Sequence, residues 1–198
     1  MLRHLFLATF ALLLTACASV EHKTLEARQK IKHDLNLAEV VDTSIMSFCW
    51  SQIGGYARCK YTPGIGILTP ESLLLVNYEN GTYVQKDILT KEDVKCISDG
   101  NGQTFTVFKN QLAVSLIPYA DGPGAANNPE FRAKALKLLQ SKGQPYLTGE
   151  AAAFIRKTDS KEYGISNVHV GGKAVPFVVG TDVHEIYSPC PSLGKAAR

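Results

Sequence analysis

The sequence predicts an α+β fold in which an antiparallel sheet or small barrel is flanked by helices. Short runs of alternating apolar and polar residues, separated by turn-forming residues, fill positions 61–117 and return after residue 165. Such alternation is typical of strands with one buried and one solvated face. Helical spacing of apolar residues precedes the first block of strands and follows it. With 45% apolar and 20% charged residues among 198, the chain can fill one hydrophobic core.

The first expected element is a helix over residues 21–48. Its apolar residues follow steps of three and four, as on one face of a helix: Ile31, Leu35, Ala38, Val41, Ile45 and Phe48. Positive side chains such as Lys23 and Arg28 allow this helix to lie on a membrane or dock on a partner. The interspersed acidic residues favour the alternative, a helix packed on the domain with its charges in solvent.

A block of short strands is expected next. Asn80-Gly81 predicts a two-residue hairpin turn, because both residue types accept a positive φ. The expected strands are Gly64–Thr69, Ser72–Tyr78, Thr82–Leu89, Asp93–Ser98, Gln103–Lys109 and Gln111–Ile117.

The C-terminal third is expected to contain an amphipathic helix and an extra β-hairpin. Asn128 is the predicted N-cap, Pro129 suits the first helical position, and Gly143 ends the helix. A second short helix is expected over Gly149–Thr158. After it the expected strands are Ile165–Val170, Ala174–Val179 and Val183–Tyr187, with a Gly171-Gly172 turn between the first two.

Part of the strand block resembles a known family. Gly66-Ile-Leu-Thr69, Leu73-Leu-Leu-Val76 and Asp87-Ile88 resemble the first three strands of a pleckstrin-homology/GRAM-like domain. The resemblance ends at Ser141 and implies a small barrel followed by a C-terminal amphipathic helix. Domains of that family often bind lipids or peptides. No dense basic cluster lies between these first strands, so binding of inositol phosphates is not expected.

The N-terminus carries the most specific pattern. Arg3 precedes an apolar run, Leu5–Leu14, that is too short to span a bilayer, which needs about 20 residues. Leu14-Thr-Ala-Cys17 then resembles the lipobox of bacterial lipoproteins. The resemblance implies a signal peptide over residues 1–16 and a diacylated Cys17 that anchors the chain by its acyl chains. Ala18 is not the aspartate that favours retention in the inner membrane, so the periplasmic face of the outer membrane is expected; the alternative is the inner membrane.

The remaining cysteines predict two disulfides. With Cys17 lipidated, Cys49, Cys59, Cys96 and Cys190 form an even set in an oxidising compartment. Three connectivities are possible. Closing the short Cys49–Cys59 loop has the lowest entropic cost, which leaves Cys96–Cys190 to fasten the C-terminus. The expected organisation is therefore a signal peptide (1–16), a lipidated N-terminus with its helix (17–48) and one disulfide-held domain (49–198).

Charge argues against a nucleic-acid partner. The formal charge is +3, and removal of residues 1–16 takes away the charge of Arg3. The remaining Lys and Arg residues are interspersed with acidic ones, whereas nucleic-acid-binding domains show basic clusters and a high pI.

Aromatic residues give the candidate partner surface. Trp50, Tyr56 and Tyr61 lie around the Cys49–Cys59 loop, and such residues dominate interface hot spots. The alternative is that they close the hydrophobic core, where large rings bury most area.

Catalytic and metal signals are weak. His169 and His184 lie in or beside expected strands and could share a metal, although a solvated pair is the commoner arrangement. No Gly-x-Ser-x-Gly motif or paired-carboxylate pattern points to a hydrolase. No enzyme activity, cofactor or metal is expected. The expected function is a structural or adaptor component of a cell-envelope assembly with protein partners; the alternative is a small-molecule or lipid-binding lipoprotein that uses the barrel mouth.

Overall fold

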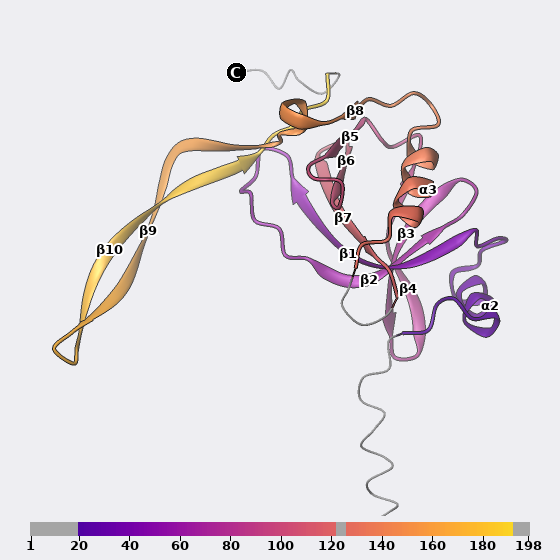
Figure 1. The fold of residues 1–198 in the computed structure, drawn as a ribbon, viewed down its shortest axis with the longest axis horizontal. Coiled ribbons are helices and arrows are strands. Elements are labelled where there is room, and N and C mark those ends of the chain that lie inside the picture. Colours follow the sequence, from indigo (N-terminus) through magenta and orange to yellow (C-terminus); the bar gives the residue numbers. More distant parts are fainter. Residues whose placement is uncertain (1–19, 122–125, 192–198) are drawn as a thin grey trace, which may run out of the picture.

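The computed structural model describes residues 20–121 and 126–191. The expected lipobox with Cys17 and the expected signal peptide over residues 1–16 lie outside this part of the chain. The described residues form an α+β fold with an eight-stranded sheet and a separate two-stranded sheet (Figure 1). The order of the large sheet is β4-β3-β2-β1-β7-β6-β5-β8. Its strands are β1 (Asp42–Gln52), β2 (Thr62–Leu68), β3 (Ser72–Glu79), β4 (Thr82–Thr90), β5 (Cys96–Asp99), β6 (Phe105–Lys109), β7 (Leu112–Tyr119) and β8 (Tyr146–Leu147).

The prediction of a long N-terminal helix over residues 21–48 is wrong in the extent of the helix. Helix α2 spans only Leu25–Leu35, with Thr24 as N-cap and Asn36 in the left-handed conformation (φ 52°) as C-cap. The residues from Asp42 onward form β1, the strand that pairs with β2 on one side and β7 on the other. The apparent helical spacing there is coincidental. Val40, Val41, Thr43 and Ile45 are β-branched, and such residues favour a strand where tertiary pairing is available.

The main core lies between the curved sheet and helix α3 (Pro129–Leu139), which Figure 1 shows against the sheet. Phe131, Ala135 and Leu139 of α3 are buried against Met46 and Phe48 of β1. The side chain of Asn128 accepts a hydrogen bond from the Phe131 N–H, and Pro129 stands at the start of the helix. The predicted N-terminus of this helix is confirmed.

Helix α2 covers the opposite face of the sheet. Ile31 packs with Ile65, Ile67, Leu74 and Tyr83 of β2, β3 and β4 in a second core. Helix α2 therefore covers part of the outer faces of these strands.

The C-terminal region departs from the expected elements. The short helix expected over Gly149–Thr158 is limited to a 3-10 turn, η2 (Gly149–Ala152). The chain then enters β9 (Ile155–Val170) and returns as β10 (Lys173–Ile186). The turn at Gly171-Gly172, with φ of 57° and 78°, is as predicted. The strands are much longer than the sequence indicated, because residues 155–158 belong to β9 instead of the expected helix and residues 159–164 continue that strand.

Candidate interaction surface: the β9–β10 arm

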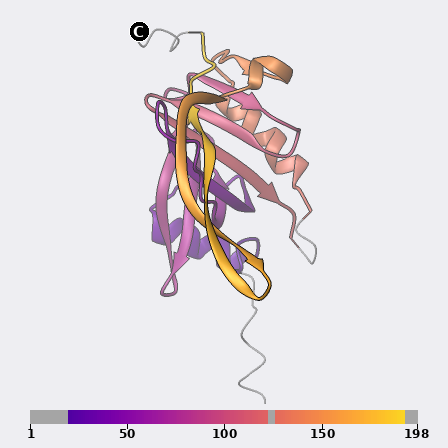
Figure 2. The same ribbon diagram turned by 90° about the vertical axis from the view of Figure 1, so that its left-hand side faces the viewer.

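The two long strands β9 and β10 form an arm that projects from the body (Figures 1 and 2). Large apolar side chains of the arm are exposed, including Ile165 at 78%, Tyr163 at 72% and Val178 at 68%. An isolated two-stranded ribbon is marginally stable in water, and a contiguous exposed apolar patch marks an interaction site. We call residues 163–180 the distal arm and the rest of the ribbon the root.

Both faces of the distal arm are apolar. Cross-strand partners share a face of an antiparallel ribbon. On one face Val168 lies opposite Val175 and Phe177 lies opposite Ser166; on the other, Ile165 lies opposite Val178. The distal arm contains two basic side chains, His169 and Lys173, and no acidic one. A surface with so little charge on either side is suited to burial.

The two edges of the distal arm differ. Pro176 lies in the middle of β10, opposite Asn167. A proline is tolerated in a ribbon where its nitrogen faces away from the partner strand, so Pro176 removes a donor from the outer edge of β10. The outer edge of β9, from Tyr163 to Val170, contains no proline. An extended segment would therefore find a full set of backbone donors only on β9.

The root is charged, and its charges are paired across the ribbon. Lys157 lies 2.7 Å from Asp182, and this contact lowers the pKa of the Asp182 carboxyl. Arg156 lies 2.5 Å from Glu185. The register shifts between Asp182 and His184, and such irregularities bend a ribbon. The charged side chains of the root therefore lie at the surface, while Val183 and Ile186 of the root are buried against the body.

The body holds the root through the loop that follows β1. The Gly54 N–H donates to the Ile186 carbonyl at 2.8 Å, and the Ile186 N–H donates to the Gly55 carbonyl at 2.9 Å. The Ala57 N–H donates to the His184 carbonyl at 2.7 Å. This loop thus forms an isolated antiparallel β-bridge, Tyr56–Glu185, beside β10.

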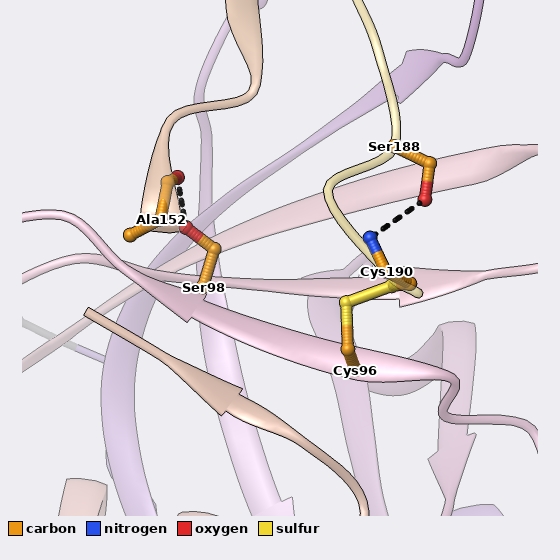
Figure 3. The surroundings of a disulfide bond; sticks show 5 residues. All are labelled: Cys96, Ser98, Ala152, Ser188 and Cys190. Atoms are coloured by element: carbon orange, nitrogen blue, oxygen red, sulfur yellow. Dashed lines mark hydrogen bonds between the residues drawn. A yellow bond between two sulfur atoms is a disulfide. The ribbon is translucent and has the colours of Figure 1, made fainter. Parts of the chain in front are cut away.

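The structure contains two disulfides, Cys49–Cys59 and Cys96–Cys190, the pairing that loop length favours. The first closes the loop that bonds to β10. The second fastens the chain just beyond β10 to β5, where the Ser98 hydroxyl also donates to the Ala152 carbonyl at 2.6 Å (Figure 3). Both half-cystines of the second pair are buried beside Phe108 and Ile186. Both disulfides therefore brace the root of the arm.

The three aromatic residues predicted as a partner surface lie apart. Trp50 packs against the main core, and its indole N–H donates to Asp87 at 2.8 Å. Tyr56 is 62% exposed beside the root, where it bridges to Glu185. Tyr61 is partly exposed, and burial raises the pKa of its phenol. Tyr56 is the member of the set that adjoins the arm.

The two histidines are not brought together. His169 lies opposite Ala174 near the tip, whereas His184 lies opposite Lys157 in the root. Among residues 20–121 and 126–191, no group of three His, Cys, Asp or Glu side chains is arranged to hold a metal ion. The same part of the chain has no helix with the length and apolarity to cross a bilayer.

A groove on the body is a further uncovered, largely apolar surface among the described residues. It has a volume of about 320 Å³ and lies on the outer side of β1, β2 and β3. Its lining is Val20, Ile45, Pro63, Gly64, Ile65, Asn77 and Tyr78. The Asn77 Oδ1 atom is buried without a hydrogen-bond donor among the described residues. A buried acceptor without a donor costs free energy.

Sequence reasoning predicted the hairpin at the tip of the arm and missed its length and its exposure. Residues 155–164 alternate poorly, because they carry charges on both faces of the ribbon, so the strand signal was restricted to residues after 165. The available signal was the run from Tyr163 to Gly180 itself, which is apolar on both strand faces and almost free of charge. A buried strand has this pattern, but here nothing in the described chain covers it.

Comparison with known proteins defines no family. No family model matches the chain, and no curated protein matches it. Among solved structures, Vav1 inhibited by an allosteric inhibitor aligns with a TM-score of 0.38 and 12% identity over 59% of this chain and 22% of that one. The apo structure of an activated truncation of Vav1 aligns with a TM-score of 0.38 and 10% identity, over 61% and 34%. The chain thus spans about a third or less of the length of these proteins, and at this TM-score they assign it neither a fold family nor a function.

Proposed function

We propose that the protein is a non-enzymatic lipoprotein, held on the periplasmic face of the outer membrane by acyl chains on Cys17. In this proposal it is a structural or adaptor component of a cell-envelope assembly. The lipobox-like Leu14-Thr-Ala-Cys17 supports the anchor. Two disulfides in a domain of this size support an oxidising compartment.

One observation carries the adaptor role. The distal arm exposes apolar side chains on both faces, while two disulfides and several backbone hydrogen bonds fix its root. A fixed root presents the apolar surface in one orientation and reduces the ordering cost of binding. Binding of a small molecule would instead call for convergent polar groups in a cavity.

A finer proposal concerns the body. We infer a pleckstrin-homology-like arrangement, supported by the order of elements: seven antiparallel strands, β1 to β7, followed by the amphipathic helix α3.

A rival proposal, binding of a small molecule or lipid, has one supporting observation. A hollow of about 360 Å³ beside α3 is bordered by Lys91, Lys134 and Lys137 together with apolar side chains such as Leu68 and Leu138. Lys91 and Lys134 are already paired, with Glu71 and Asp42 respectively. That pairing favours the adaptor role over an anion site.

The anchor is tested by membrane fractionation of cells that express Cys17→Ala. Without the thiol no thioether-linked diacylglycerol can form, so the variant is expected to remain an unprocessed precursor and to lose its acyl-dependent anchoring. Ser19→Ala, two residues further along, is the matched control and should be processed as the wild type is. Wild-type processing and fractionation of Cys17→Ala would contradict the proposal.

The adaptor role is tested by crosslinking in intact envelopes. The wild type is expected in crosslinked complexes larger than one chain, and replacement of Ile165 and Val178 by lysine should deplete these complexes. The control is Ile88→Lys, which places a charge on an exposed apolar residue of β4. A wild type that is recovered only as single chains would contradict the adaptor role.

A further inference from the structure

We propose that the tip of the distal arm, residues 168–175, inserts into the same lipid leaflet that holds the acyl chains of Cys17. The tip is then a second membrane contact, made by side chains, in addition to the covalent anchor. The proposal rests on the proposed function in taking Cys17 as the anchored residue. It adds a phospholipid surface as a ligand, and it leaves the part of the distal arm with Ile165 and Val178 free for a protein partner.

The first argument is that the tip presents an apolar end. Val168 lies opposite Val175, and Val170 lies opposite Lys173, so the three valines share one face of the ribbon. All three are exposed, Val170 at 62%. The Gly171-Gly172 turn adds no polar side chain. Entry into lipid removes these valines from water without a change in the ribbon, because the pairing of β9 with β10 already satisfies the inner backbone groups.

The second argument is charge. The distal arm has no acidic residue, and the ionisable side chains of the tip are both basic, His169 and Lys173. Phospholipid surfaces carry phosphate groups, and anionic lipids attract such side chains. A lysine next to apolar residues can extend its ammonium group to the headgroups while its stem stays in the apolar region.

The third argument is depth. The three cross-strand pairs of the tip extend about 10 Å along the strands, at about 3.4 Å a residue. The boundary between headgroups and acyl chains, in which amphipathic peptides lie, is about 5–10 Å deep. Deeper entry is opposed by the unpaired edges of the ribbon, which find no hydrogen-bond partner in hydrocarbon. It is also opposed by the acidic residues of the root: Asp159, Glu162, Asp182 and Glu185.

The fourth argument is position. In both Figure 1 and Figure 2 the arm ends at the same lower end of the molecule as the indigo start of the described chain. The described chain begins at Val20, three residues after Cys17, and three residues span at most about 11 Å. An acyl anchor on Cys17 therefore holds this end of the molecule close to the leaflet. The arm runs obliquely in Figure 1, so its tip reaches that level before the rest of the arm does.

The anchor also makes a weak contact sufficient. Three valines and one lysine would give a free protein little affinity for a membrane. A tethered protein, however, meets its second site at a millimolar effective concentration. The root is fixed by two disulfides and by backbone hydrogen bonds, which reduces the ordering cost of binding at the tip.

Tethered vesicles test the contact. In the mature-length chain, residues 17–198, the other four cysteines form disulfides, so the Cys17 thiol can be coupled to a maleimide lipid. The vesicles contain phosphatidylethanolamine and phosphatidylglycerol with brominated acyl chains, which quench tryptophan on contact. Val170→Trp places the probe at the tip. Its emission is expected to shift to shorter wavelength and to fall by about half or more, because the tether keeps most molecules engaged.

Matched variants separate the tip from the rest of the molecule. Ile88→Trp, at an exposed residue of β4, is coupled in the same way and should not be quenched. The parent chain, whose Trp50 packs against the main core, gives the background emission. Adding Val168→Asp to Val170→Trp places a carboxylate on the apolar face and should abolish the quenching. Circular dichroism checks that each variant is folded.

Several outcomes would overturn the proposal. They are an unquenched tryptophan at position 170, equal quenching at position 88, and quenching that survives Val168→Asp. A photo-reactive phenylalanine analogue at position 170 in intact envelopes should crosslink to phospholipid, and crosslinks to protein alone would also overturn it. Because the coupling through Cys17 is chemical, these outcomes leave the natural acyl anchor unaffected. Failure of that anchor would instead appear in the fractionation of Cys17→Ala.

Discussion

Asp34 is the side chain that fastens α2 to the sheet. It accepts the Tyr83 N–H of β4 at 3.0 Å and lies 3.0 Å from the Lys30 ammonium. These interactions, the Tyr83 hydrogen bond first, lower the pKa of Asp34 to about 2 from 3.8. A lowered carboxyl pKa stabilises the folded state above the unfolded value, and this contribution is lost as the pH falls from 3.8 towards 2.

We expect Asp34→Asn to lower the free energy of unfolding at pH 7, because the amide oxygen accepts the same hydrogen bond without the charge. The difference between variant and wild type should shrink as the pH falls below 3.8, where the wild-type carboxyl loses its advantage. Urea unfolding at pH 7 and pH 3 measures both effects. Glu26→Gln, on the first turn of the same helix, is the control for a simple loss of charge. An equal difference at both pH values would contradict the role assigned to Asp34.

Gly64 allows β2 to lie close to its neighbours. A Cβ at this position would lie 2.5 Å from the Val76 carbonyl oxygen and 2.6 Å from the Phe48 ring. The backbone oxygen cannot move without disturbing the pairing of β2 and β3. This close approach explains why a glycine occupies position 64.

Gly64→Ala is therefore expected to destabilise the protein by about 1–3 kcal/mol, the range for overpacked cores. The midpoint of urea denaturation measures this loss. Gly100→Ala is the control, because a Cβ there meets no atom within 4 Å and the φ of Gly100 is not positive. Equal denaturation midpoints for Gly64→Ala and Gly100→Ala would show that the neighbours of Gly64 can move to accommodate the added methyl group.

At the scale of elements, the two disulfides are expected to act differently on the arm. Cys49–Cys59 spans a sequence separation of 10, whereas Cys96–Cys190 spans 94. Because loop-closure entropy grows with loop length, replacing Cys96 and Cys190 by serine should cost more global stability, about 2–5 kcal/mol.

The Cys49→Ser/Cys59→Ser variant should instead loosen the root locally. Amide hydrogen exchange at Gly54, Ala57 and Ile186, which join the loop to β10, should accelerate more than exchange in the β2–β3 pair. The Cys96→Ser/Cys190→Ser variant provides the comparison. Uniform acceleration across the sheet would indicate that the short disulfide supports the whole fold and not the root.

The elements that the sequence predicted are those with local signals. The Asn80-Gly81 turn has φ values of 51° and 81°, and α3 begins at the predicted Asn128 cap. The sequence could not show that residues 21–48 divide into a helix, α2, and part of a strand, β1. Val41, Ile45 and Phe48 fit the spacing of a helix as well as a strand. Pairing with both β2 and β7 decided between them.

At the scale of the whole molecule, body and distal arm should be energetically separate. The distal residues are exposed and pair with one another, and the cross-strand partners Glu162 and Thr181 mark where they begin. Replacing residues 163–180 by an Asn-Gly turn is therefore expected to change the melting temperature of the dilute protein by less than about 2 °C.

The matched deletion removes a hairpin of the body, namely the β3–β4 turn with the cross-strand residue pairs beside it. It should lower the melting temperature strongly, because Leu73–Val76 and Tyr83 of this hairpin are buried. Differential scanning fluorimetry measures both variants. A large loss of stability on removal of the distal arm would mean that it supports the body, and would argue against its role as a free binding element.

The sequence by itself determined the α+β class, the turn residues and the N-cap of α3, and among three connectivities it favoured the disulfide pairing that the structure has. Each of these depends on chemistry within a few residues or on simple chain entropy. Only the tertiary structure decided that Asp42–Gln52 is a central strand, and that residues 155–186 form an arm with both disulfides at its root. An apolar run has the same appearance in sequence whether it is covered or exposed. Coverage depends on what the rest of the chain packs against it, and for the distal arm the described chain packs nothing there.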